Sequence, residues 1–342
     1  RGYNDMFPNI AKDPAFNVVS LSTSINILPN NYGRVIKSGL FPIKGVATRV
    51  VAIEEYQGIL TLLPTKPLGA PGTTGKSGKR KVRTFQIPHI PHDDSIVASD
   101  IAGVRAMGSQ DQMQTITQVV NDKLQSMKNK HMITLEHLTM GALKGIILDA
   151  DASILYNLYT EFEITQKEVD FLLGTGTTKV ANKCREVVRH IEANLKGEVM
   201  SSVRALVSQE FYDKLITHAL VEKAYDGWAA AQDRIGGDLR KGFTFGGMTF
   251  EEYVGSAPDK DGNTRRFITA DEGHAFPEGT TETFATHCAP ADFIETVNTI
   301  GQHIYAKMEE MKFGRGIEMH TQSNPLPLCH RPAVLVKIKS SN

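Results

Sequence analysis

The sequence contains few cysteines and no long apolar run, and both absences narrow the classes of protein that it can encode. The three cysteines, Cys184, Cys288 and Cys329, lie far apart in the chain. Their odd number and wide spacing argue against a disulfide framework and against a metal site built from CxxC pairs. No apolar stretch reaches the ~18 residues of a membrane-spanning helix. We therefore expect no membrane contact and a reducing compartment such as the cytoplasm.

The chain also lacks an excess of charge of either sign. Lysine plus arginine number 38, and aspartate plus glutamate number 38, so the net charge is zero when histidine is neutral. No global positive field is therefore available to hold nucleic acid through counterion release. We expect any contact with DNA to be local or weak. Residues 1–8 lack the charged-then-apolar order of a signal peptide, so we expect no export signal.

The N-terminal region, with many turn formers and only short apolar segments, shows no sustained helical or strand period. It predicts an extended arm that becomes ordered by lying on another surface. Strand formers at residues 48–56 and 59–63, on either side of Gln57 and Gly58, then predict two paired strands.

A long β-excursion with a flexible basic tip is predicted next. Residues 64–80 are rich in glycine, proline, threonine and lysine. Residues 81–88 have the alternation of a β-strand. Its two sets are Val82, Thr84 and Gln86 on one side and Arg83, Phe85 and Ile87 on the other.

A helix of unusual length follows. Residues 109–112, SQDQ, match a capping box, and apolar or small residues then recur at alternating spacings of three and four from Met113 to Ala142. Roughly 35 helical residues would span roughly 50 Å, far more than an average helix. Such a helix needs support from a sheet, an arm or a neighbouring subunit, unless Gly141 or Gly145 interrupts it.

The second half of the chain has the signals of a mixed α/β unit. Residues 153–164 predict a strand pair or one long strand, and the apolar spacing over 180–195 predicts a helix closed by Gly197. Residues 203–207 predict a buried strand, after which Ser208 is placed to cap another helix.

Three segments imitate catalytic motifs, but each lacks a required part. Residues 69–77 resemble a phosphate-binding loop, with Ala70 where glycine is needed and a β-pattern instead of a helix behind it. Residues 174–179 resemble a dinucleotide fingerprint without its third glycine, so a loop preceding a helix is the favoured interpretation.

Asp149 and Asp151 resemble the nucleophile motif of haloacid dehalogenase-type phosphotransferases. That chemistry also needs a downstream acidic metal site, and residues 237–242 lack its second acid. We favour two acids that solvate a turn. The histidines and cysteines have no zinc-ligand spacing, and no set of base, nucleophile and charge stabiliser is present. We expect no catalytic residue, no cofactor and no metal.

Several longer phrases carry a family resemblance. The most distinctive is FATHCAPADF at residues 284–293, followed by ETVNT at 295–299, GIE at 316–318 and QSNPL at 322–326. Others are PHIP at 88–91, LEH at 135–137, GALKG at 141–145, and ALVS at 205–208 with Phe211. In order and over nearly the whole chain, they resemble the lambda-like major capsid proteins, the phage capsid protein E family.

The resemblance implies an α+β fold of the Hong Kong 97 phage type. Its parts would be an N-terminal arm (1–46), an extended β-hairpin loop (47–95), a peripheral domain with a long spine helix (96–170), and an axial domain whose strands return to the peripheral domain (171–342). It also implies a major capsid protein, without enzymatic activity, that self-assembles into the icosahedral head shell around the double-stranded DNA of a tailed bacteriophage.

The implied partners are further copies of the chain in pentamers and hexamers, decoration, scaffolding and portal proteins, and packaged DNA bound without sequence specificity. The implied location is the virion, after assembly in the host bacterial cytoplasm. The basic hairpin suggests one contact, in which its tip meets an acidic surface on an adjacent subunit. Its cations are Lys76, Lys79, Arg80, Lys81 and Arg83. A phosphotransferase using Asp149 and Asp151 and an encapsulin-like compartment protein are the alternatives.

Overall fold

The longest helix organises the structure. The computed structural model describes residues 18–27, 33–56, 80–101, 116–235, 238–258 and 262–341. Helix α4, Ile116–Lys144, has 29 residues and spans roughly 44 Å. The predicted apolar face is buried from Val120 to Ala142. Gly141 stays helical, and the helix ends where Gly145 adopts a φ of 79°. The predicted capping box lies outside the described residues.

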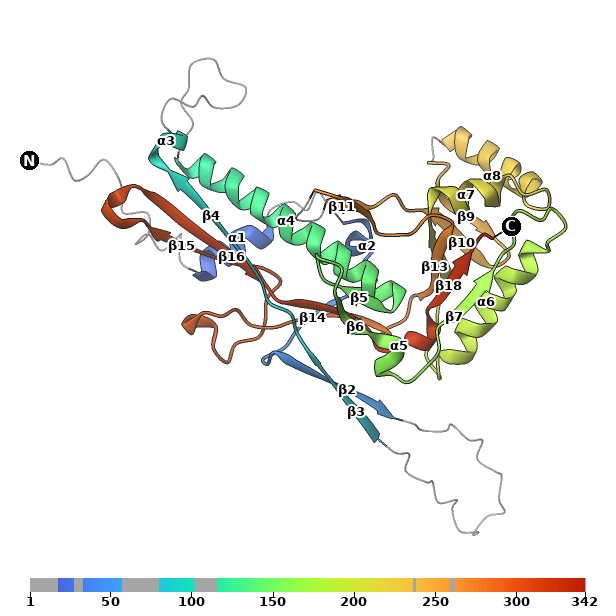
Figure 1. The fold of residues 1–342 in the computed structure, drawn as a ribbon, viewed down its shortest axis with the longest axis horizontal. Helices are drawn as coiled ribbons and strands as arrows, with labels where there is room; N and C mark the ends of the chain where they lie inside the picture. The colour runs from blue at the N-terminus through green and yellow to red at the C-terminus, as the bar shows by residue number, and fades with distance from the viewer. Residues whose placement is uncertain are drawn as a thin grey trace, which may run out of the picture.

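One end of the molecule consists of a small antiparallel sheet and helix α1 packed on α4 (Figure 1). The sheet has the order β15-β16-β4. Its strands are β4, Ile90–Val97; β15, Tyr305–Glu310; and β16, Gly316–Ser323. Helix α1, Val18–Ile27, contributes Leu21 and Ile25 to the core between these elements.

The expectation of an extended N-terminal arm without a helical period is wrong at residues 18–27, which form helix α1. Leu21 and Ile25 are four residues apart, so they lie on one face of a helix, and both are buried against the chain's own β15 and α4. Packing of two apolar side chains decides the conformation here, although the surrounding serines and threonines are weak helix formers.

The other end is a lobe built on a six-stranded sheet, with helices α6, α7 and α8 around it (Figure 1). The strand order is β7-β18-β13-β8-β10-β9. The strands are β7, Lys167–Asp170; β8, Ser202–Val207; β9, Lys241–Phe245; β10, Met248–Glu252; β13, Glu272–Glu278; and β18, Val336–Lys339. The pairs β8–β10 and β7–β18 are parallel, and the others are antiparallel. This confirms the predicted mixed α/β unit.

The helices of the lobe begin and end near the predicted signals. They are α6, Val180–Asn194; α7, Gln209–Ile216; and α8, Glu222–Ile235. Ser208 caps α7, because its Oγ accepts a hydrogen bond of 3.2 Å from the backbone nitrogen of Phe211. Gly197 follows α6 with a φ of 91°, in the left-handed region that favours glycine.

Short elements connect the two ends. A third sheet has the order β1-β14-β17, with β1, Ile43–Gly45; β14, Phe284–Cys288; and β17, Pro325–Cys329. Two small pairs are β5, Ile146–Leu148, with β6, Ile154–Asn157, and β11, Ser256–Pro258, with β12, Thr264–Arg266. The short helices of the described residues are α2, Arg34–Lys37; α3, Ala98–Ile101; and α5, Leu158–Glu161. 3-10 turns lie at Ile294–Thr296, Lys312–Gly314 and Pro332–Val334.

The predicted strand at residues 153–164 is wrong over its second half. Strand β6 ends at Asn157, whose side-chain oxygen accepts hydrogen bonds from the backbone nitrogens of Tyr159 and Thr160. Such a cap starts a helix. Helix α5 therefore follows, and it buries Leu158 and Tyr159.

A two-stranded ribbon projects from the body (Figure 1). Strand β2, Val50–Tyr56, pairs antiparallel with β3, Arg80–Gln86. The expected partner of β2, residues 59–63, lies outside the described residues, so the pairing found here joins the two ends of the excursion. The predicted alternation is confirmed, since Phe85 and Ile87 are buried whereas Val82 is 54% exposed.

Candidate functional site

The five predicted contact cations do not share one environment. Lys76 and Lys79 lie outside the described residues, and Arg80 pairs through its backbone with Tyr56 on β2. The Nζ atom of Lys81 lies 2.6 Å from Oε1 of Glu163, just after α5. Contacts of these cations with another subunit remain a prediction.

Arg83 is held by its own chain at the base of the ribbon. Its Nε donates a hydrogen bond of 2.7 Å to the carbonyl oxygen of Glu161, and its guanidinium lies 4.6 Å from the centre of the Phe162 ring. Only 9% of the residue is exposed. The strand alternation that places Arg83 with Phe85 and Ile87 explains this, because that face of β3 packs on the body.

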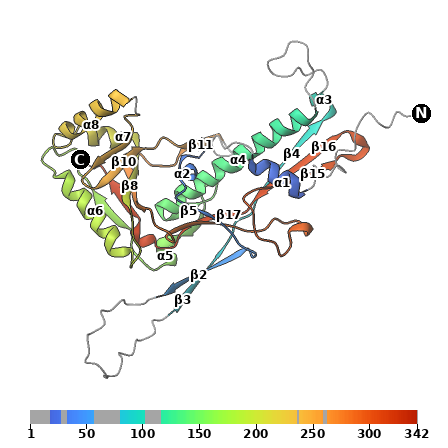
Figure 2. The same ribbon diagram turned by 180° about the vertical axis from the view of Figure 1, so that it is seen from behind.

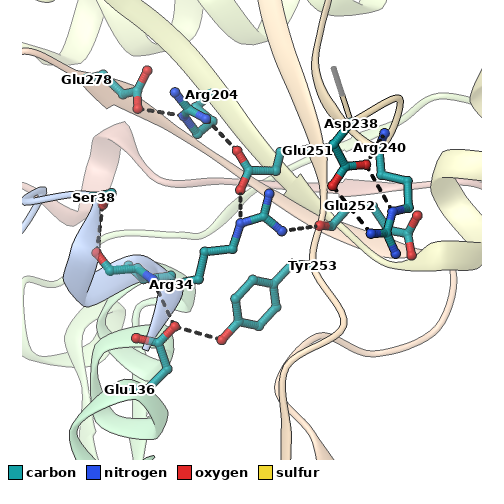
Figure 3. Close-up of polar contacts among 11 residues, drawn as sticks. Arg34, Ser38, Glu136, Arg204, Asp238, Arg240, Glu251, Glu252, Tyr253 and Glu278 are labelled. Carbon is teal, nitrogen blue, oxygen red and sulfur yellow. Dashed lines mark hydrogen bonds and ion pairs between the residues drawn. The ribbon is translucent and has the colours of Figure 1, made fainter. Parts of the chain in front are cut away.

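A cluster of polar groups, the polar junction, ties α2 and α4 to the lobe (Figure 3). Its six residues are Arg34, Glu136, Arg204, Glu251, Tyr253 and Glu278. Glu136 on α4 is 4% exposed and accepts three hydrogen bonds. They come from the backbone nitrogens of Val35, at 2.9 Å, and Ile36, at 3.1 Å, and from the Tyr253 hydroxyl, at 2.9 Å.

Two arginines flank Glu251 within the junction (Figure 3). Nε of Arg34 lies 2.5 Å from Oε1 of Glu251, and NH1 of Arg204 lies 2.5 Å from its Oε2. Arg204 also pairs through Nε with Glu278 at 2.6 Å. Each charge thus has a partner of opposite sign or several hydrogen-bond donors. Such a cluster can be retained in a largely buried place, where an unpaired charge would cost several kcal/mol.

The pKa shifts of Arg204 and Tyr253 agree with a structural role for the junction. Burial opposes the charge on Arg204, but the ion pairs with Glu278 and Glu251 outweigh it and raise the pKa of the guanidinium. Burial and the neighbouring Glu136 carboxylate raise the pKa of Tyr253, so its hydroxyl remains a proton donor. A depression of about 410 Å³ lies beside the junction, lined in part by Glu136, Tyr253 and Phe267.

Two of the segments that imitate catalytic motifs form a turn and a loop in the structure. Asp149 Oδ1 accepts a hydrogen bond from the nitrogen of Ala150, and Asp151 Oδ1 accepts bonds from the nitrogen and hydroxyl of Ser153. Both acids are exposed in the turn between β5 and β6, which confirms the turn interpretation. Residues 174–179 form the loop before α6, and residues 69–77 lie outside the described part of the chain.

The described residues contain no group of three or more histidine, cysteine or acidic side chains arranged to hold a metal ion. Burial raises the pKa of each of the three cysteine thiols to about 12. The structure does bring together two histidines that lie far apart in the sequence. Nε2 of His287 lies 3.1 Å from Nε2 of His330, because β14 pairs with β17. No sequence signal connects residues 43 positions apart in this way.

His131 on α4 lies beneath the small sheet at the end opposite the lobe. Its ring nitrogens lie 2.8 Å from the Ser323 hydroxyl and 3.0 Å from the Thr321 hydroxyl. Burial lowers the pKa of His131 to about 3. This neutral, hydrogen-bonded histidine fastens α4 to β16.

The fold described above has matches among known proteins. Residues 17–340 match the family described as phage major capsid protein E. The chain belongs to this family. This capsid protein is 32% identical over 342 residues to the major capsid protein of Pseudomonas phage KPP10, with 95% of this chain and 97% of the relative covered.

Two solved structures share the fold of this capsid protein. A prophage protein from E. coli CFT073 gives a TM-score of 0.58 at 14% identity, with 95% of this chain and 99% of the other covered. The mature capsid of bacteriophage PhiM1 gives 0.52 at 11% identity, with coverages of 92% and 89%. The family match makes the chain a structural subunit of a tailed-phage head, and the solved structures show that it has the predicted α+β fold of the Hong Kong 97 type.

The main elements of this capsid protein have clear counterparts in the predicted architecture. Helix α4 lies within the predicted peripheral domain, the β2–β3 ribbon lies within the predicted extended loop, and five of the six strands of the lobe lie within the predicted axial domain, the exception being β7. The division into these domains remains a prediction. Among the described residues, no helix combines the length and the apolarity that a bilayer span demands.

Proposed function

We propose that pentamers and hexamers of this chain close an icosahedral shell around packaged double-stranded DNA. The family match over residues 17–340 carries the proposal. The projecting β2–β3 ribbon supports it, because an isolated two-stranded ribbon is marginally stable in water and gains stability when a neighbouring subunit covers it. Heterologous contacts between identical chains generate such closed rings.

The shell is proposed to act without catalysis, cofactor or metal, and to recruit decoration, scaffolding and portal proteins. Assembly in the host bacterial cytoplasm precedes its place in the virion. Packaged DNA would contact it without sequence specificity, which is consistent with a net charge of zero. The arm, extended loop, peripheral domain and axial domain, at residues 1–46, 47–95, 96–170 and 171–342, are the proposed working units.

Expression of the full chain in bacteria tests the function. We expect fast-sedimenting particles that negative-stain microscopy shows as closed shells. A protein that stays monomeric at every salt concentration and hydrolyses p-nitrophenyl phosphate with Mg²⁺ would instead support the phosphotransferase based on Asp149 and Asp151. Shells that enclose a host enzyme in place of DNA during infection would support the encapsulin-like alternative.

Within the shell, we propose that Lys76, Lys79 and Arg80 contact an acidic surface of the adjacent subunit. Lys81 and Arg83 belong to the same basic set but also hold the base of the ribbon. Single exposed ion pairs contribute about 0–1 kcal/mol each, yet they repeat around every ring. Replacing Lys76, Lys79 and Arg80 by serine should lower the salt concentration at which assembly fails, measured by sedimentation. Full-size shells at normal yield and unchanged salt sensitivity would contradict this contact.

A further inference from the structure

The turn between β15 and β16 presents an aromatic side chain to solvent. Phe313 is 90% exposed and has a φ of 67° and a ψ of 18°, in the left-handed region that disfavours bulky residues. Backbone hydrogen bonds from Met311 to Gly316 and from Gly314 to Met311 close the turn. The chain thus holds Phe313 in a costly conformation without burying it, and such strain marks a candidate functional position.

Two cations flank this aromatic residue in the sequence. The Arg315 guanidinium lies 5.6 Å from the centre of the Phe313 ring, and Lys312 is exposed beside it. In the described residues, neither cation forms an ion pair. The hairpin lies at the end of the molecule opposite the lobe in both views (Figures 1 and 2). Residues 312–315 are called the hairpin tip below.

An acidic surface lies on the same small sheet. Glu309 and Glu318 are exposed and stand directly opposite each other in the β15–β16 ladder, where like charges are destabilising. Within the described part of the chain, neither has a cationic partner. Asp93 on β4, with 78% of its side chain exposed, contacts His320, which is charged only when protonated. These three acids are called the acidic face.

The acidic face borders a depression of about 830 Å³ whose lining is partly polar and partly apolar. Phe293, Met308 and Met319 contribute to that lining. Methionine adapts its shape to an aromatic ring and makes favourable sulfur–aromatic contacts. Two other charged residues that line the depression have partners within the chain. Lys307 pairs with Glu295 at 3.1 Å, and Asp94 pairs with Lys123 at 2.9 Å. The depression therefore combines acids that lack a cationic partner among the described residues, Glu309 and Glu318, with apolar side chains.

We propose that the hairpin tip of one copy of this chain docks on the acidic face of a second copy. Phe313 would enter the depression, while Lys312 and Arg315 would pair with Glu309, Glu318 and Asp93. The two surfaces carry opposite charge, and the depression offers apolar side chains to an aromatic ring. Because tip and face are different surfaces, the contact is heterologous and can close a small ring of copies.

This inference rests on the proposed shell function, since it assigns one of the contacts between shell subunits. A direct test places cysteines at both surfaces, in the variant Phe313→Cys with Glu318→Cys. The three native cysteines are buried, so they do not compete. Mild oxidation of assembled particles should give covalent oligomers on non-reducing gels. Each single variant, and Phe313→Cys combined with Val199→Cys on the lobe, serves as the control and should stay monomeric on the gel.

Charge exchange provides the second test. The tip-reversed variant carries Lys312→Glu and Arg315→Glu, and the face-reversed variant carries Glu309→Lys and Glu318→Lys. The latter keeps a like-charge pair in the ladder, so the fold experiences similar repulsion. Each variant alone should reduce particle yield about tenfold, because like charges then face each other at every repeat of the contact. The chain with all four changes should recover most of the yield, because tip and face again have opposite charge.

The aromatic anchor is tested by Phe313→Asn. Asparagine tolerates the left-handed conformation, so thermal unfolding of the subunit should be unchanged or slightly improved, while particle yield falls. Normal wild-type shells without the cysteine crosslink, and with normal assembly of Phe313→Asn, would overturn the contact and leave the shell function intact. A wild-type chain that never forms particles would overturn the shell function, and this contact with it.

Discussion

Two charged regions at different places in this capsid protein use charge in opposite ways. In the polar junction, Glu251 is 7% exposed and lies between Arg34 and Arg204, so its charge is balanced inside the chain. On the acidic face, Glu309 and Glu318 repel each other in open solvent. The difference indicates that the balanced charges define the shape of the subunit, while the unbalanced ones are available to its neighbours.

The largest expected effect on subunit stability comes from replacing a glutamate by glutamine in the polar junction, compared with the same replacement on the acidic face. Glu251→Gln removes the charge between two partly buried guanidiniums and should lower the free energy of unfolding by about 3 kcal/mol, because Arg34 loses its acidic partner while Arg204 keeps only Glu278. Glu309→Gln should change it by less than about 0.5 kcal/mol, or stabilise the fold slightly, since it relieves repulsion. Urea unfolding of assembly-incompetent subunits measures both. Equal losses would contradict the comparison.

A second prediction concerns pH and the inner side of the sheet that carries the acidic face. Burial lowers the pKa of His131 to about 3, below its ordinary value of 6.5. The unfolded chain therefore binds a proton at a higher pH than the folded one. The contribution of neutral His131 to the unfolding free energy is therefore complete above about pH 6.5 and is lost as the pH falls toward 3.

The variant His131→Gln tests this titration, because glutamine can still bond to Thr321 and Ser323. Between pH 7 and pH 5, the wild type should lose about 2 kcal/mol more unfolding free energy than the variant. Urea unfolding at the two pH values measures this difference. Parallel pH profiles for the two proteins would show that His131 is not the titrating group.

The same contrast occurs within strand β3, between two of its cations, Arg83 and Lys81. Arg83→Ala removes a hydrogen bond to Glu161 and the stacking on Phe162, and should cost about 2 kcal/mol of subunit stability. Lys81→Ala breaks only an exposed pair with Glu163 and should cost about 0–0.5 kcal/mol. Thermal unfolding compares them. If Lys81→Ala proves the more harmful to folding, the assignment of Arg83 to the base is wrong.

Local patterns predicted the elements whose side chains have a regular period. The three-and-four spacing predicted the buried face of α4, and the strand alternation predicted that Phe85 and Ile87 lie on one side of β3. The cap at Ser208 was equally visible, because a cap needs only residues within one turn. The family phrases predicted the fold as a whole.

Other features depended on contacts that no local pattern contains. Helix α1 is decided by the burial of Leu21 and Ile25, and the partner of β2 by the closure of a long excursion. The interpretation of Arg83 as one more surface cation overlooked its own alternation with Phe85. Periodicity shows which side chains share one side of a strand, but only packing shows which side contacts the rest of the protein.

The amino-acid sequence by itself determined the fold class, the long helix α4, the alternation of β3 and the membership in a capsid family, because period, caps and family phrases are local or directly comparable. Only the tertiary structure decided which charges are balanced. Glu136 meets Val35 from about a hundred residues away, and Glu309 meets Glu318 across a hairpin. Charges separated along the chain interact through space, so their pairing is a property of the folded subunit.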